Sequence, residues 1–344
     1  MATMKDIAKI AGTSIGTVSL ALNGSSMVKL ETRYRIQQIA KELNYHPNQS
    51  ARSLVTKETK VVALFRTSGV KYPLDDDADP FASNVDTLVL NMLPPIQDQI
   101  RQEGYSILID GFTPEQAAEQ GNPILSSSTI DGAFFFGGMI NHAQLEYIRN
   151  SSIPSVLICA RDNTIDFVDT DPTEGIRLAV QYMIDHGHRQ IAFINGSSRS
   201  QASMLKLAGY QQALADNRIP VDGNLIEFTE FSGISVTSAM DRLWSTGVRP
   251  TAFVGGTDYI ACGILRYLQQ KNLRCPEDVS IIGYENSSPA VYSTPAITSV
   301  NIHKNRLGKE AANTLLNRIK NPNARHVGLI IPPKLVIRDS VASI

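Results

Sequence analysis

Residues 4–24 read MKDIAKIAGTSIGTVSLALNG, and this stretch predicts two short helices joined by a tight turn. Thr3 is in position to cap the first helix, and Asp6 places a negative charge near its positive end. Gly12 ends that helix, because glycine accepts the left-handed backbone of a helix terminus. Ser14 is then the cap of a second helix that begins only two residues later.

The second helix is expected to end at Asn23-Gly24, and a third is expected from about residue 31 to 44. Two short helices with a glycine-containing turn and a third packing helix form the helix-turn-helix arrangement, whose second helix enters the major groove of DNA. An ordinary three-helix bundle is the alternative. The residues expected to face DNA on the second helix are Ser14, Ile15, Gly16, Thr17, Ser19 and Leu20.

The charge of the chain is unevenly distributed. Residues 1–60 contain nine Lys and Arg against four Asp and Glu, a net charge of +5. The other 284 residues carry 23 basic and 29 acidic side chains, a net charge of −6, so the near-neutral total of −1 hides a basic head on an acidic body. Such a head suits a polyanion, although a solvated helical surface gives the same count.

One combination of residues extends across the whole head: Met4–Ala8, Gly12, Thr17–Ser19, Leu22–Gly24, Glu31–Arg33, Asn44-Tyr45, Pro47-Asn48 and Ala51–Leu54. By these residues the head resembles the LacI/GalR family of transcriptional regulators. The resemblance implies that residues 48–60 form a hinge helix and linker, and that Leu54 enters the minor groove as an apolar wedge. A wedge of this kind unstacks a base step and kinks the duplex. A small apolar anchor in a linker is the alternative for Leu54.

The resemblance also implies DNA contacts outside the second helix, from Thr3, Asn23, Asn48, Ala51, Arg52 and Leu54. The chain departs from the family at Leu20, where relatives usually carry arginine. Leucine cannot pair with guanine through two hydrogen bonds, as arginine does, and only contacts apolar groups such as thymine methyls. The sequence therefore predicts an operator preference different from that of arginine-bearing relatives.

From residue 61 onward, short apolar runs alternate with helical segments, which is typical of doubly wound parallel sheets. About 284 residues suit two lobes better than one sheet. We therefore predict an all-α helix-turn-helix domain at 1–47, the hinge and linker at 48–60, and a two-lobed α/β core at 61–344. In open α/β sheets, ligands bind at the carboxyl ends of the strands.

The core also resembles the family, whose architecture is similar to that of periplasmic sugar-binding proteins. The resemblance implies a homodimer, one lobe at about 61–160 and 291–322, and a second lobe at about 161–290 and 323–340. The matching segments are His186–Ile194, Gly209–Leu214, Arg249–Ala252, Pro276–Tyr284 and Pro295–Val300.

The effector site that the resemblance implies includes Lys206, Thr257, Asp258 and Glu285. Arg161 and Asp171 are expected to face the same cleft because they lie at predicted strand ends. Carboxylates and cations across a cleft suit sugar hydroxyls or a carboxylated or phosphorylated ligand. Lys206 stands where many relatives have arginine, and Glu285 where many have aspartate, so the usual sugar pose is altered. A solvated lysine and an N-cap aspartate are the alternatives for Lys206 and Asp258.

The rest of the sequence argues against other classes of protein. Three scattered cysteines provide neither a disulfide framework nor a zinc site, no phosphate-binding glycine loop appears, and no apolar run approaches the length of a membrane span. We expect no cofactor, no metal and no catalysis, and a cytoplasmic protein that binds operator DNA, a small effector and a second copy of itself. A solute-binding protein without DNA function is the alternative.

Overall fold

The computed structural model describes residues 2–22, 24–45, 58–67, 84–229 and 233–344, and it forms two compact units, 1–59 and 60–344. The predicted hinge helix, with Asn48, Ala51, Arg52 and Leu54, lies outside the described residues, as does Asn23. Within the described ranges, no helix is both long and apolar enough to cross a membrane.

The first unit consists of helices α1 (Met4–Ala11), α2 (Ile15–Leu22) and α3 (Leu30–Glu42). Thr3 and Asp6 form the predicted capping box, in which the Asp6 carboxylate accepts a hydrogen bond of 2.8 Å from Thr3 N. Gly12 ends α1 in the left-handed conformation, with φ of 62°. The three-helix prediction is thus confirmed. Both ends of α1 and the start of α2 are set by contacts within a few residues.

The three helices share one small apolar core. Ile7 of α1, Val18 of α2 and Ile36 of α3 are completely buried there. Arg33 closes the loop between α2 and α3 by donating hydrogen bonds to the carbonyl oxygens of Ser25 and Val28. The packing fixes which side of α2 remains available to solvent.

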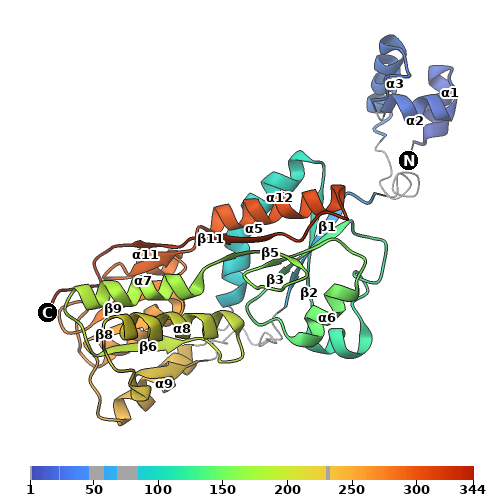
Figure 1. Cartoon of the computed structure of the whole chain (residues 1–344). Helices are drawn as coiled ribbons and strands as arrows, with labels where there is room; N and C mark the ends of the chain where they lie inside the picture. The colour runs from blue at the N-terminus through green and yellow to red at the C-terminus, as the bar shows by residue number, and fades with distance from the viewer. Residues whose placement is uncertain (1, 23, 46–57, 68–83, 230–232) are drawn as a thin grey trace. The chain divides into compact units, whose positions relative to one another are not determined.

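The second unit contains two sheets, each of six described strands. In Figure 1 the colour runs from blue at the N-terminus to red at the C-terminus, so the elements of this unit can be followed in chain order. The first sheet is parallel throughout, in the order β11-β5-β4-β3-β1-β2. Its strands are β1 (Val61–Arg66), β2 (Ser106–Gly111), β3 (Gly132–Phe136), β4 (Ser155–Ile158), β5 (Asp166–Thr170) and β11 (Gly328–Ile331).

Helices cover both faces of the first sheet. Alternate residues of β1 point to opposite faces, so that Val62 and Leu64 pack toward α5 (Asn84–Gln102) and α12 (Lys304–Lys320). Ala63 and Phe65 pack toward α6 (His142–Asn150) on the other face. Pro94 and Pro95 lie inside α5, which continues past both. A π-helical turn, η2 (Gln116–Gln120), follows β2.

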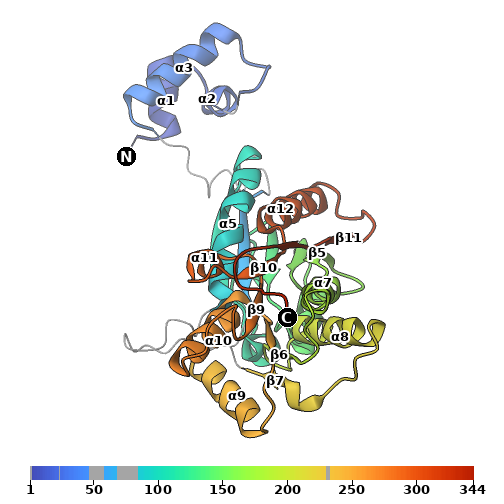
Figure 2. The same ribbon diagram turned by 90° about the vertical axis from the view of Figure 1, so that its left-hand side faces the viewer.

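The second sheet has the order β12-β10-β9-β8-β6-β7, with β12 antiparallel to β10 and the other pairs parallel. Figure 2 shows α7 and α8 on one face of this sheet and α9 and α10 on the other. Its elements are β6 (Ile191–Asn195), β7 (Ile226–Phe228), β8 (Ala252–Gly255), β9 (Ser280–Tyr284), β10 (Thr298–Asn301), β12 (Lys334–Val336), α7 (Pro172–Asp185), α8 (Gln201–Asp216), η3 (Gly223–Leu225), α9 (Gly233–Ser245), α10 (Asp258–Gln270) and α11 (Ser288–Tyr292).

The predicted fold class, a helical head followed by two doubly wound lobes, is confirmed, but the predicted lobe boundaries need correction. β5, expected in the second lobe, pairs with β4 in the first sheet. β10, expected in the first lobe, pairs with β9 in the second sheet. The final segment divides between the lobes, with β11 in the first sheet and β12 in the second. Short strands do not reveal their partners, because pairing is decided by residues distant in sequence.

Three described segments pass between the lobes: β5 to α7, β10 to α12, and β11 to β12. His303, in the second of them, adopts a left-handed backbone with φ of 56° directly before α12. These crossings lie close to the carboxyl ends of β5 and β10. They place the boundary between the lobes next to the strand ends where a ligand is expected.

Candidate functional site

The exposed side of α2 carries the side chains predicted to face DNA. Val18 and Ala21 are buried against the other helices, which leaves Ser14, Ile15, Gly16 and Leu20 exposed and Thr17 and Ser19 half-buried. Thr3, at the start of α1, is also exposed. Contact of these residues with DNA remains a prediction.

The amino end of α2 has hydroxyl groups around it. The Ser14 hydroxyl accepts a hydrogen bond of 3.1 Å from Thr17 N, which confirms Ser14 as the cap of this helix. Its oxygen lies 2.9 Å from Thr17 Oγ1. A helix amino end with exposed hydroxyls favours phosphate oxygens. On α2, the first residue Ile15 and Leu20 expose 42% and 38% of their surface, so this face offers apolar rather than cationic contacts to base edges.

The second unit contains a cavity between the lobes, with a volume of about 90 Å³. The cavity lies at the carboxyl ends of β3, β4, β5 and β9, as expected for a doubly wound fold. Its wall is largely apolar, with polar groups at separated points, as is typical of small-molecule sites. The lining residues are Leu88, Phe136, Gly138, Met139, Cys159, Asp169, Thr170, Pro172, Ser200, Ala202, Ser203, Lys206, Thr257, Tyr284, Glu285 and Ile302.

Lys206 is a buried cation in this wall, with 8% of its surface exposed. Its Nζ donates a hydrogen bond of 2.6 Å to Gly256 O and lies 4.0 Å from the centre of the Tyr284 ring. Burial lowers the pKa of its ammonium, while the nearby carboxylate of Glu285 opposes that shift. An aromatic face and a carbonyl oxygen thus stabilise the charge in place of water.

Glu285 provides the carboxylate near the Lys206 ammonium, and 7% of its surface is exposed. Among the described residues, none donates a hydrogen bond to its carboxylate oxygens, which border the cavity. Burial raises the pKa of this carboxyl to about 7, against the attraction of Lys206. Glu285 therefore presents an acceptor that a ligand can satisfy.

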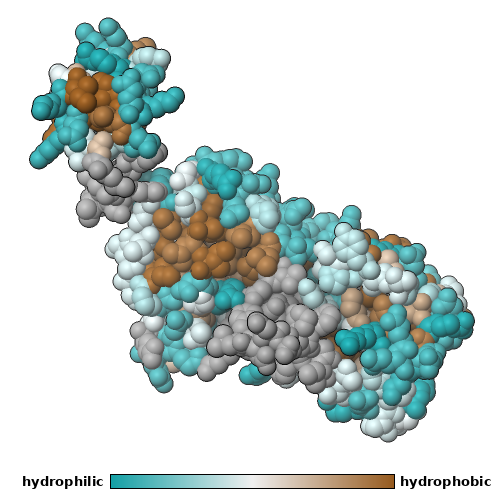
Figure 3. Space-filling view, turned by 180° about the vertical axis from the view of Figure 1, so that it is seen from behind, coloured by the Kyte–Doolittle hydropathy of each residue, from teal (hydrophilic) through white to brown (hydrophobic). Residues whose placement is uncertain are grey.

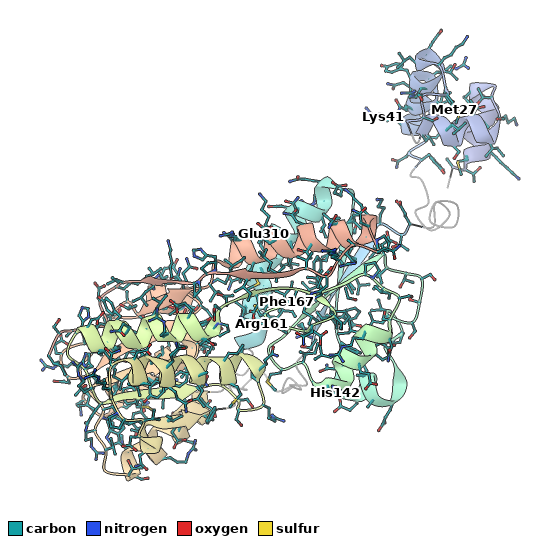
Figure 4. The ribbon with its side chains drawn as sticks, in the orientation of Figure 1. Met27, Lys41, His142, Arg161, Phe167 and Glu310 are labelled. Atoms are coloured by element: carbon teal, nitrogen blue, oxygen red, sulfur yellow. The ribbon has the colours of Figure 1, made fainter. Side chains whose placement is uncertain are left out.

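Three of the six predicted effector residues do not line the cavity. Arg161, labelled in Figure 4, donates hydrogen bonds of 2.7 Å to the carboxylate of the lining residue Asp169 and to Thr170 O. Asp171 caps α7 by accepting from Glu174 N. Both side chains are held by protein contacts and neither is among the residues that line the cavity, so their part in an effector site stays a prediction.

Asp258 is the third predicted residue outside the lining. It is completely buried, and its carboxylate accepts hydrogen bonds from Ser287 N, Ser287 Oγ and Ser299 Oγ. Thr257, next to it, caps α10 and does line the cavity, as do Lys206 and Glu285. Asp258 therefore serves as a structural anchor for the loop after β9, and the other three keep their predicted place.

Sequence reasoning missed the apolar part of the wall, including Phe136, Met139 and Ile302, and the carboxylate of Asp169. Burial raises the pKa of Asp169, and the ion pair with Arg161 opposes that shift. For Phe136 the available signal was its position at the end of an apolar run, which forms β3, whereas Asp169 lies one residue before the end of β5, a strand that the sequence reasoning did not predict. Within the described part of the chain, no cluster of His, Cys, Asp and Glu could hold a metal ion.

Comparisons with known proteins agree with both units. Residues 3–48 match the model of bacterial regulatory proteins of the lacI family, and residues 180–341 match a periplasmic binding protein-like domain. The ribose operon repressor of Haemophilus influenzae is 32% identical over 347 aligned residues, covering 100% of each chain. The transcriptional repressor PurR of Salmonella arizonae is also 32% identical, covering 99% of this chain and 97% of its own.

Solved structures share the fold over nearly the full length. A lac repressor dimer bound to operator and an anti-inducer has a TM-score of 0.85 at 23% identity, covering 99% of both chains. A complex of the regulator CelR with cellobiose has a TM-score of 0.73 at 27% identity, covering 99% of this chain and 100% of its own. Because full-length relatives are 32% identical, this chain belongs to the lacI family of bacterial regulatory proteins.

Proposed function

We propose that this chain is a transcriptional repressor whose affinity for operator DNA is controlled by a small molecule, a sugar or sugar derivative, held between the lobes. The observation that supports it is the union, in one chain, of a helix-turn-helix unit with α2 exposed and a two-lobed core with a buried cavity. A ligand that prefers one lobe arrangement would shift the population of states with different operator affinity. The proposed hinge at 48–60 would transmit this change in lobe arrangement to the DNA-binding head.

The charges around the cavity favour a neutral ligand. The cations of Lys206 and Arg161 are balanced by the carboxylates of Glu285 and Asp169, and Arg161 is occupied by Asp169. An added phosphate would face two buried carboxylates. A sugar instead offers an apolar face to Tyr284 and hydroxyl donors to Glu285. We therefore expect D-ribose or cellobiose to raise the melting temperature, and ribose 5-phosphate to fail, in a thermal screen.

The proposal includes a homodimer. Figure 3 shows an apolar patch on the second unit that lies over α5 and β2. Leu90 of α5 and Ile109 of β2 expose 61% and 47% of their surface. Contiguous apolar surface of this kind marks an association site, and a second copy of the chain is the partner that fits the proposed function. Such a repressor has no catalytic role and acts in the cytoplasm.

The test of the proposal is selection of duplex DNA by the full-length chain, followed by a gel-shift titration with salt. Specific binding that weakens steeply as salt rises is expected, because basic side chains of the head would displace counterions from phosphates. The alternative, a solute-binding protein without DNA function, predicts that no duplex is selected even at low salt. That outcome would remove the repressor proposal.

Changing Leu20 to arginine is expected to alter which operator is selected. A guanidinium on the exposed side of α2 can pair with guanine through two hydrogen bonds, worth about 1–3 kcal/mol of discrimination. The variant should therefore prefer guanine at one half-site position by roughly 5- to 150-fold. Parallel selections with the two proteins measure this. Identical half-sites would show that residue 20 does not contact bases, and Leu20→Met is the apolar control.

Changing Leu54 to alanine is expected to reduce specific operator affinity by roughly 10- to 100-fold, since the wedge recovers a few kcal/mol of unstacking through wider contact. The melting temperature should not change, because the prediction places Leu54 in the hinge rather than in either core. Titration against the selected duplex and against random DNA separates specific from non-specific loss. If affinity for the selected duplex stays the same, Leu54 is a linker residue and not a wedge.

A further inference from the structure

Lys304 stands where the chain passes from one lobe to the other. It is the first residue of α12, and the chain reaches it from β10 of the second sheet. α12 belongs to the first lobe, where Leu307 and Leu315 are completely buried. The helix fits closely against α5, since a Cβ added at Gly308 would stand 2.8 Å from Met92 O. A displacement of Lys304 therefore requires α12 to move with its neighbours.

The side chain of Lys304 reaches back to the second lobe. Its Nζ donates hydrogen bonds to Glu285 O and, at 2.9 Å, to Asn286 O. Lys304 is half-buried, and burial lowers the pKa of its ammonium while the carboxylates of Glu285 and Asp258 oppose the shift. The two carbonyl oxygens thus take the place of water around this cation.

The two residues that Lys304 holds have an unusual backbone. Glu285 and Asn286 have φ of 106° and 53°, although neither is glycine. Consecutive left-handed residues of this kind persist only where surrounding contacts hold them. This backbone directs the Glu285 side chain to the cavity, so whatever holds the backbone also positions the carboxylate.

The other described contacts of this loop come from the second lobe. Glu285 N donates to Val300 O at 2.8 Å, and Asn286 N donates to Ser299 Oγ at 2.9 Å, both on β10. Arg338, which follows β12, donates to the Asn286 side chain. Of the loop's hydrogen-bond partners in the described ranges, Lys304 alone lies on a helix of the first lobe. It is therefore the contact that a change in lobe geometry would strain first.

We propose that Lys304 is a positioning residue that couples the cavity to the first lobe. Its ammonium fixes the Glu285–Asn286 backbone in one lobe arrangement, and movement of α12 relative to the second sheet loosens these hydrogen bonds and turns the carboxylate. By reciprocity, a ligand bound to Glu285 favours the arrangement in which Lys304 holds the loop. This inference rests on the proposed function, because operator binding is its output.

The test uses Cys159, which lines the cavity, as a reporter in the full-length protein. The rate of its alkylation by iodoacetamide is followed by peptide mass spectrometry, with and without the selected operator duplex. In the unaltered chain, the duplex should change this rate about fivefold or more, the lower end of ordinary coupling between sites. In Lys304→Met, which keeps the side-chain stem and removes the donors, the two rates should agree within about twofold.

Two further variants separate positioning from a general structural role. Lys304→Arg should restore the operator-dependent change, because a guanidinium can donate to both carbonyl oxygens. Lys309→Met removes an exposed lysine of the same helix and should behave as the unaltered chain. If Lys304→Met melts at a much lower temperature, Lys304→Gln, which retains one donor group, replaces it in the same comparison.

Each outcome decides the inference. The inference is overturned if operator changes the rate of Cys159 alkylation as much in Lys304→Met as in the unaltered chain. An unaltered chain that binds operator without any change at Cys159 also overturns it and leaves the repressor proposal intact. Failure of the full-length chain to select any duplex defeats both, and the selection step shows this before any variant is made.

Discussion

Replacing Gly209 with alanine is expected to destabilise the second unit by about 2–3 kcal/mol, a large effect for the addition of one methyl group. Gly209 lies in α8, and a Cβ built there would stand 2.1 Å from Thr173 O of α7. The obstructing atom belongs to a helix backbone and cannot rotate away. α7 and α8 must separate, at a cost that exceeds the roughly 1 kcal/mol by which alanine favours a helix over glycine.

Calorimetry of the full-length chain measures this prediction. A unit of about 280 residues should lose roughly 4–10 °C of melting temperature for that change in stability. Ligand binding should weaken as well, because Lys206 lies one turn earlier on α8 and borders the cavity. An unchanged melting temperature would contradict the close approach of the two helices.

Gly16→Ala is the matched control for Gly209→Ala. It is also a helical glycine, but a Cβ added there meets only Ser14 Oγ at 3.6 Å, an ordinary contact. This change should leave the second unit unaffected and stabilise the head by up to about 1 kcal/mol, because alanine is the better helix former. The pair therefore separates close packing from helix propensity.

Replacing Glu285 with alanine is expected to weaken ligand binding by roughly 10- to 150-fold. This is the loss of affinity expected when one hydrogen bond to a charged group is removed. Glu285 carries the carboxylate that no described residue satisfies, so the ligand would lose its charged acceptor. Titration calorimetry with the compound that raises the melting temperature most gives the ratio. Glu277→Ala, at an exposed position, is the control and should bind as the unaltered chain does. Equal affinities for Glu285→Ala and the unaltered chain would exclude this carboxylate from the site.

The pH dependence follows from the same carboxyl. The pKa of this carboxyl is about 7 in the folded chain, above the ordinary value of 4.5. Between these two pH values, Glu285 is therefore protonated in the folded chain and ionised in the unfolded chain. The stability from protonated Glu285 is fully present below pH 4.5 and is lost as the pH rises through about 7. A ligand that donates to the ionised carboxylate should bind more tightly as the pH rises toward 7, and then level off. Glu285→Ala should remove both dependences, which melting and titration series across this range will show.

The head shows how far the sequence alone could be interpreted. The Thr3–Asp6 capping box, the Gly12 terminus and the Ser14 cap all appear as predicted. Each depends on groups within four residues, so the determinants of these helix ends are local. The alternation of strands and helices in the core was also predicted, because continuous apolar runs between helical segments have few other interpretations.

The site was only partly accessible to such reasoning. Lys206, Thr257 and Glu285 line the cavity, whereas Arg161, Asp171 and Asp258 are held by other side chains or backbone groups. A motif match identifies residue types at strand ends, but it does not show which of two neighbouring groups faces the ligand. That choice is made by hydrogen bonds to residues up to 41 positions away, as between Asp258 and Ser299.

The sequence by itself determined the helix-turn-helix head, the alternation of strands and helices, and the charge division between the two units. Each of these depends only on the local sequence pattern or on the amino-acid composition. Only the tertiary structure decided that β5 and β11 belong to the first sheet and β10 to the second. Only the tertiary structure brought Lys304 onto the carbonyl oxygens of Glu285 and Asn286. The physical reason is that sheet pairing and buried charge are satisfied by partners distant in sequence, which chain order does not specify.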